Sequence, residues 1–118
     1  MSKLEPLIEI LAFFSAMRNY GYIDRLSNSL DEVTAYEALK DAMRDYLSQC
    51  VDRRDKCVEV DRETKLLCPD VNPDDLREAV NTFMAKIKDQ PGDVIVKETR
   101  RLALMALSRK VKAMERRC

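Results

Sequence analysis

The sequence has no histidine and no tryptophan, only two glycines, and four prolines among 118 residues. Without histidine, the chain lacks the commonest general base and the commonest metal ligand of proteins, so a histidine-dependent catalytic triad is excluded. Gly21 and Gly92 alone cannot build a glycine-rich phosphate loop. Such low glycine and proline content also argues against a sheet protein with many tight turns. No apolar run is long enough to span a membrane.

Charged and apolar residues dominate the composition instead. Apolar residues make up 46% of the chain, too many for a disordered protein, and charged residues make up 36%. The segments between the few glycines and prolines are rich in Leu, Ala, Met, Glu, Lys and Arg, which favour helices. We therefore predict an all-α fold, a single-domain bundle of about four helices over residues 1–118 with one long central helix.

The first helix is predicted from about Leu4 to Tyr20. Ser2 and Glu5 have the spacing of a capping box at its start, and Gly21 is expected as its C-cap. Apolar residues surround most of its circumference, which is typical of a helix buried on more than one side. A short helical turn is expected at residues 23–26.

The second helix is predicted over residues 30–58, and it is the longest. Ser29 and Glu32 form its expected capping box. Residues 59–72 are expected to form an acidic loop with an extended piece at 64–67. The predicted buried stripe of this helix is Val33, Tyr36, Leu39, Met43, Tyr46, Leu47 and Cys50.

The third helix, predicted over residues 73–88, has the clearest start signal in the chain. Asn72 is the expected N-cap, Pro73 occupies the first turn, and two aspartates follow. A turn at residues 89–92 leads to a fourth helix over residues 94–116. The expected inner residues are Leu76, Val80, Phe83, Met84 and Ile87 on the third helix, and Leu104, Leu107, Val111 and Met114 on the fourth.

The four cysteines are too widely spaced for the close pairs of a four-cysteine zinc site. On a continuous helix, Cys50 and Cys57 are about 10.5 Å apart along the axis, too far for one disulfide. A bridge between Cys57 and Cys68 across the loop remains open, and the alternative is free thiols in a reducing compartment. Because no signal peptide is visible, a cytoplasmic location is expected.

No motif specifies a metal or cofactor. Asp70, Asn72 and Asp74 match the first positions of a calcium-binding loop. Asp75 and Asn81 stand where that loop needs a glycine and a glutamate, and helix capping already explains the aspartates. We therefore expect neither a cofactor nor a metal site.

The strongest asymmetry of the sequence is charge at its C-terminal end. Eight basic and two acidic side chains give residues 94–118 a net charge of +6, whereas the whole chain is neutral. A basic helix with an apolar stripe suits docking to an acidic protein surface, binding to phosphates, or a solvated outer face. The candidate partner-binding residues are Phe13 and Phe14 on the first helix and Arg100, Arg101, Arg109, Lys110, Lys112, Arg116 and Arg117 on the fourth.

We therefore predict a non-enzymatic protein–protein interaction module. It could act as an adaptor, inhibitor, regulator or accessory subunit of a larger assembly, with homodimerisation as one form of contact. Small helical proteins of this kind are also common in phages and viruses, an analogy only. One alternative is a small nucleic-acid-binding regulator that uses residues 94–116. A second is a metal-dependent phosphohydrolase that uses acids of the second helix, including Asp41 and Asp45.

Overall fold

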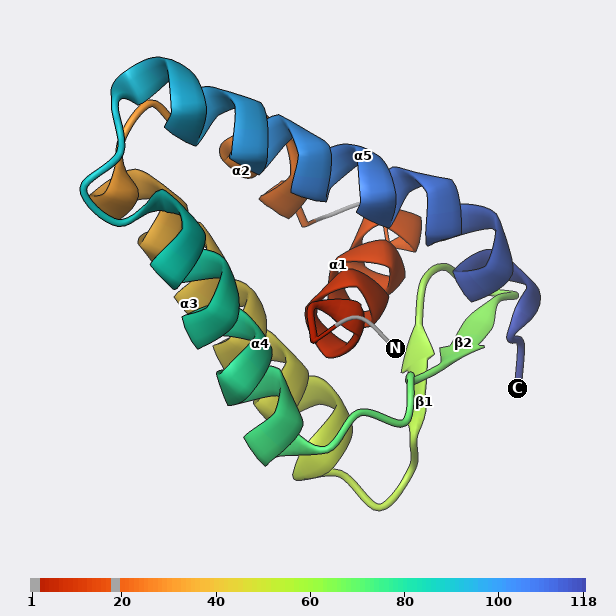
Figure 1. Ribbon diagram of the computed structural model, residues 1–118. Helices are drawn as coiled ribbons and strands as arrows, with labels where there is room; N and C mark the ends of the chain where they lie inside the picture. Colours follow the sequence, from red (N-terminus) through yellow and green to blue (C-terminus); the bar gives the residue numbers. More distant parts are fainter. Residues whose placement is uncertain (1–2, 18–19) are drawn as a thin grey trace.

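The computed structural model describes residues 3–17 and 20–118. This part of the chain is mostly helical, with a small antiparallel sheet at one end, and it confirms the predicted helical bundle (Figure 1). The elements in chain order are α1 (Glu5–Ala16), α2 (Tyr22–Ser27), α3 (Glu32–Tyr46), the π-helical turn η1 (Leu47–Val51), β1 (Cys57–Glu59), β2 (Lys65–Leu67), α4 (Pro73–Ile87) and α5 (Gly92–Glu115).

Helix α1 lies at the centre of the molecule and contacts all four other helices (Figure 1). Its apolar residues point in several directions, so one neighbouring helix cannot cover them all. The predicted burial of this helix on more than one side is therefore confirmed. Its buried residues are Leu7, Ile8, Ile10, Leu11, Ala12, Phe13 and Phe14.

The ends of α1 differ from the prediction. The helix ends at Ala16, four residues before Tyr20, because Met17 is extended and turns its side chain into the core. Gly21 is not its C-cap but precedes α2, with an ordinary negative φ of −92°. Ser2 of the predicted capping box lies outside the described residues. The short helical turn expected at residues 23–26 is confirmed as α2.

Helix α3 starts two residues later than predicted and buries only part of the predicted stripe. Asp31, rather than Ser29, is the N-cap, and its carboxylate accepts a 2.8 Å hydrogen bond from the backbone N–H of Thr34. Ser29 is buried, and its hydroxyl donates to the carbonyl of Arg25 at the end of α2. The predicted capping box is therefore wrong. The buried residues of α3 are Ala35, Ala38, Leu39, Ala42 and Tyr46, whereas Val33 and Tyr36 are exposed.

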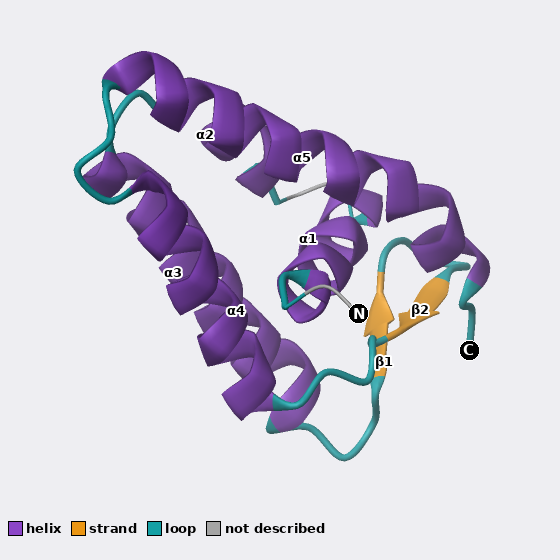
Figure 2. Ribbon diagram, in the orientation of Figure 1, coloured by secondary structure: helices purple, strands orange, loops and turns teal. Residues whose placement is uncertain are grey.

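The predicted long helix ends at Val51 instead of residue 58. A π-helical turn finishes it, and the ammonium group of Lys56 donates to the carbonyl of Cys50 at 2.6 Å, satisfying a helix-end acceptor. A disulfide between Cys50 and Cys68 ties this end to the residue after β2. The chain therefore turns back as a β-hairpin, in which β2 matches the predicted extended piece and β1 replaces predicted helix (Figure 2).

The hairpin register decides the cysteine pairing. Cys57 lies opposite Leu67, and Cys68 is the next residue, so Cys57 and Cys68 project from opposite faces of the ladder. The bridge between them that the sequence left open is therefore not formed. Cys68 pairs with Cys50 on the buried face, and Cys57 pairs with Cys118 on the other, so no cysteine is free.

Helix α4 is the element that the sequence predicted best. Asn72 is its N-cap, and the side-chain oxygen accepts from the N–H groups of Asp74 and Asp75. The predicted inner residues are confirmed except that Met84 is only partly buried. Within residues 3–17 and 20–118, every helix is too short or too polar to cross a bilayer.

A buried phenol joins α3 to the start of α4. The hydroxyl of Tyr46 lies 2.8 Å from the carbonyl oxygen of Pro69 and 3.0 Å from that of Val71, and it accepts from the N–H of Val71. Burial raises the pKa of Tyr46, so this hydroxyl keeps its proton and can donate.

We expect Tyr46→Phe to lower the free energy of unfolding by about 1–2 kcal/mol, because carbonyl groups beside a buried ring would lose their donor. Urea denaturation measures the change. Tyr36→Phe on the exposed side of the same helix is the control, with an expected effect below about 0.5 kcal/mol. Equal stability of the two variants would contradict the role given to Tyr46.

Candidate docking surface on helix α5

Helix α5 buries Ile95 and Leu102 together with smaller side chains, and it exposes several other large apolar residues. It packs mainly against α1 and α2, and its buried face includes Thr99, Ala103 and Ala106. Small residues let helix backbones approach closely, so this face fits against the bulky side chains of α1. The stripe predicted to face the core is therefore on the outside. It consists of Leu104 (66% exposed), Leu107, Val111 (63% exposed) and Met114.

The exposed stripe has the spacing of a helix–helix contact. Its four residues follow one another at intervals of three, four and three, which is the heptad pattern of a coiled-coil seam. Lys97 and Arg100 extend the same pattern toward the start of α5. In the rest of this paper, the outer face of α5 means Lys97, Arg100, Leu104, Leu107, Val111 and Met114.

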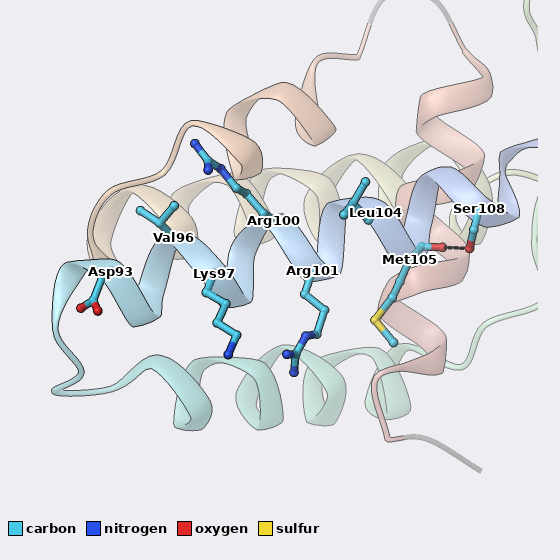
Figure 3. A pocket seen from close by; sticks show the side chains of 8 residues that line it. All are labelled: Asp93, Val96, Lys97, Arg100, Arg101, Leu104, Met105 and Ser108. Atoms are coloured by element: carbon cyan, nitrogen blue, oxygen red, sulfur yellow. Dashed lines mark hydrogen bonds between the residues drawn. The ribbon is translucent and has the colours of Figure 1, made fainter.

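A shallow depression of about 670 Å³ lies along the first two thirds of this helix. In Figure 3, Lys97 and Arg101 extend from one side of α5, and Arg100 extends from the other. Arg101 forms a 3.5 Å ion pair with Glu98, whereas Lys97 and Arg100 have no ion pair within the described part of the chain. The lining residues are Asp93, Val96, Lys97, Arg100, Arg101, Leu104, Met105 and Ser108.

Arg109 has a structural role that the sequence did not reveal. Its guanidinium group binds both carboxylate oxygens of Glu5 and lies 2.8 Å from a carboxylate oxygen of Glu9, which fixes α5 to α1. Hydrogen bonding by Arg109 holds the pKa of Glu5 below its usual value of 4.5, because it favours the ionised carboxylate. Arg109 is therefore already occupied by two internal partners and is not available to a second molecule in this arrangement.

The other basic candidates remain at the surface. Arg100, Arg101, Lys112, Arg116 and Arg117 are exposed, and Lys110 is partly buried. Arg116 and Arg117 lie beyond α5, where their backbone pairs with β2. The exposed basic candidates therefore lie near the middle of α5, at Lys112 near its end, and in the segment that follows it.

Phe13 and Phe14 are in the core. They are 1% and 0% exposed, and their rings pack against each other at 5.5 Å between centroids. Neither side chain reaches the molecular surface, so Phe13 and Phe14 cannot make the partner contact that was expected of them in this arrangement. The exposed large apolar side chains lie instead mainly on α5 and around the start of α3.

A second apolar patch, at the start of α3 and just before it, was not predicted. Leu30 and Val33 are 69% and 67% exposed, and the ring of Tyr36 lies beside the ammonium group of Lys40. The sequence contained a signal for it, because alanines at 35, 38 and 42 form an alternative helical stripe. The predicted stripe is confirmed at Leu39, Tyr46 and Cys50, but it is wrong at Val33 and Tyr36, which are exposed.

The acids proposed for a phosphohydrolase have protein partners. Asp41 forms ion pairs with Arg25 and Arg44, and Asp45 accepts a hydrogen bond from the hydroxyl of Tyr22. Burial and Asp45 together raise the pKa of Tyr22. Within the described residues, no three cysteine, aspartate or glutamate side chains are grouped so that they could hold a metal ion. This arrangement serves the packing of α2 on α3.

We expect Arg109→Met to lower the free energy of unfolding by about 1 kcal/mol at neutral pH, a small value because solvent screens the one-third-exposed pair. The folded-state pKa of Glu5 is lowered, so the stabilisation is present above pH 4.5 and is lost as the pH falls through the folded pKa. The difference between variant and wild type should therefore shrink at about pH 3.

Urea denaturation at both pH values measures this difference. Lys97→Met is the matched control, since Lys97 has no ion pair in the described part of the chain, and it should change stability little at either pH. A constant deficit for Arg109→Met across the pH range would show that it acts through packing of its stem instead of its charge.

Comparison with known proteins gives the chain a family. No curated protein and no solved structure matches it. A family model described as CRISPR-associated protein (Cas_Csa5) matches residues 10–115, a range that holds the hairpin, α2, α3, α4, α5 and most of α1. Since this match covers far more than half of the sequence, the chain belongs to the Cas_Csa5 family of CRISPR-associated proteins.

Proposed function

We propose that this chain is an accessory subunit of a CRISPR-associated assembly. In this proposal it is a non-enzymatic, cytoplasmic protein that binds a neighbouring protein subunit through the outer face of α5. The family supports the accessory-subunit role among those predicted from the sequence. Nothing in the family description supports an inhibitor, a regulator, a homodimer or a viral origin.

The exposed heptad stripe is the observation that carries the proposal. Four large apolar side chains lie in a row on a helix whose opposite face is buried in the core. Contiguous exposed apolar surface rimmed by charge is typical of a protein interface. Lys97 and Arg100 continue the row without internal partners in the described region, so a partner with an apolar centre and an acidic rim would satisfy both parts.

Nucleic acid is the second candidate, and the exposed basic side chains favour it. Arg100, Lys112 and Arg116 are exposed, and CRISPR-associated assemblies contain RNA. Phosphate binding would use these charges but would leave Leu104 and Val111 in water. Protein docking uses the whole face, and for this reason we place it first.

We expect Leu104→Glu combined with Val111→Glu to weaken association with the other protein subunits of the assembly by about tenfold or more, since central apolar contacts dominate interface energy. Equilibrium titration of the purified chain against those subunits measures the loss. Leu30→Glu combined with Val33→Glu is the matched control, because these residues, at and just before the start of α3, are about as exposed as Leu104 and Val111. Loss of association in the α3 variant alone would contradict the proposal and move the interface to that patch.

Salt dependence separates the two candidates. Lys97→Glu combined with Arg100→Glu should change binding to protein subunits modestly, as rim charges do. If the face binds nucleic acid instead, affinity for labelled single-stranded RNA or DNA should fall steeply between about 50 and 200 mM salt, and this variant should abolish it. Light scattering of the free chain in the same buffers shows whether a second copy competes for the face.

A further inference from the structure

The segment that follows α5 covers an edge of the β-hairpin. The N–H of Leu67 donates to the carbonyl of Arg116 at 2.6 Å, and the N–H of Cys118 donates to the carbonyl of Lys65 at 3.1 Å. Arg117 forms an antiparallel bridge with Leu66 between these two bonds. Residues 116–118 therefore act as a third strand, which pairs backbone groups that β2 would otherwise present to solvent.

The two disulfides lie in different environments. Residues at alternate positions of the hairpin point to opposite faces, and Val58, Leu66 and Cys68 share the buried one. The bridge between Cys50 and Cys68 is on that face, with both residues at least 94% buried. The bridge between Cys57 and Cys118 is on the outer face, where Cys57 is partly buried and Cys118 is exposed.

The outer bridge is also the only disulfide that joins residues 116–118 to the hairpin in the described structure, and it attaches them to Cys57 of β1. The side chains of Arg116 and Arg117 are exposed and form no ion pair in the described part of the chain. Two backbone hydrogen bonds between solvent-exposed groups contribute only modestly to stability. The covalent bond is therefore the main constraint on this segment.

We infer that the Cys57–Cys118 bridge is a thiol–disulfide exchange site for a dithiol reductant, and that its opening uncovers the edge of β2. A thiolate of the reductant attacks the exposed sulfur of Cys118, the S–S bond breaks, and Cys57 leaves as a thiolate that takes up a proton. The second thiol of the reductant then displaces Cys118. The chain gains two electrons and two protons, and the reductant becomes a disulfide.

The inner bridge is protected from the same attack, because exchange needs access to a sulfur atom. Cys50 and Cys68 are covered by the core on one side of the hairpin, so they should remain joined while the outer bridge opens. The opened form keeps its helices and its hairpin. In this form the N–H of Leu67 and the carbonyl of Lys65 are unpaired, and an extended segment of another chain could form backbone hydrogen bonds with them.

The test uses the full chain, purified without reductant and treated with dithiothreitol over a time course. Alkylation of the thiols followed by peptide mass spectrometry reports which bridge has opened. We expect Cys57 and Cys118 to be labelled about tenfold faster than Cys50 and Cys68, or more. Hydrogen exchange of the two-thiol form should show faster exchange at Leu67, with unchanged protection in α1 and α4.

The double variant Cys57→Ser/Cys118→Ser should show the fast exchange at Leu67 without reductant, and Arg117→Ala, which leaves the bridge intact, is its control. If the double variant does not fold, the partly reduced wild-type chain gives the same measurement. Opening of both bridges at one rate, or protection of Leu67 that persists after the outer bridge opens, would overturn the inference.

Discussion

Burial of α1 is the constraint on which the rest of the structure depends. A helix with apolar side chains around most of its circumference is stable in water only when other helices surround it. Each leucine, isoleucine or phenylalanine that α1 buries contributes about 1.5–3 kcal/mol relative to an exposed side chain. The remaining helices are therefore arranged around α1, and the carboxylates at its start bind Arg109 and fix the position of α5 along it.

This arrangement creates the candidate docking face. The inward faces of α5 and α3 combine a few large residues, such as Leu102 and Leu39, with several alanines, and other large residues of both helices point outward. The same sequence feature therefore fills the core and leaves an exposed heptad stripe. In the proposed assembly, another subunit covers this stripe. Lys97 and Arg100, which form no ion pair in the described part of the chain, lie at the end of the stripe nearer the start of α5.

At the other end of the molecule, covalent bonds replace helical packing. The hairpin has only three residues in each strand, too few for independent stability. Disulfides on its two faces join it to the end of the α3–η1 helix and to the segment after α5. The different exposure of these bridges follows from the alternation of side chains along β1 and β2. It is the basis for the thiol–disulfide exchange proposed for the outer bridge.

Local signals in the sequence determined the helical class, the position of α4 and the burial of α1 on more than one side. Asn72, Pro73 and the two aspartates after them act within a few residues of one another, so their pattern can be read without the fold. The inward face of α3 and α5 was decided only in the tertiary structure. Two helical stripes compete on each helix, and the neighbouring helices decide which one packs: α1, α2 and α4 for α3, and mainly α1 and α2 for α5. Tertiary structure also decided the cysteine pairing, because the register of a hairpin that the sequence did not reveal sets which sulfur atoms can meet.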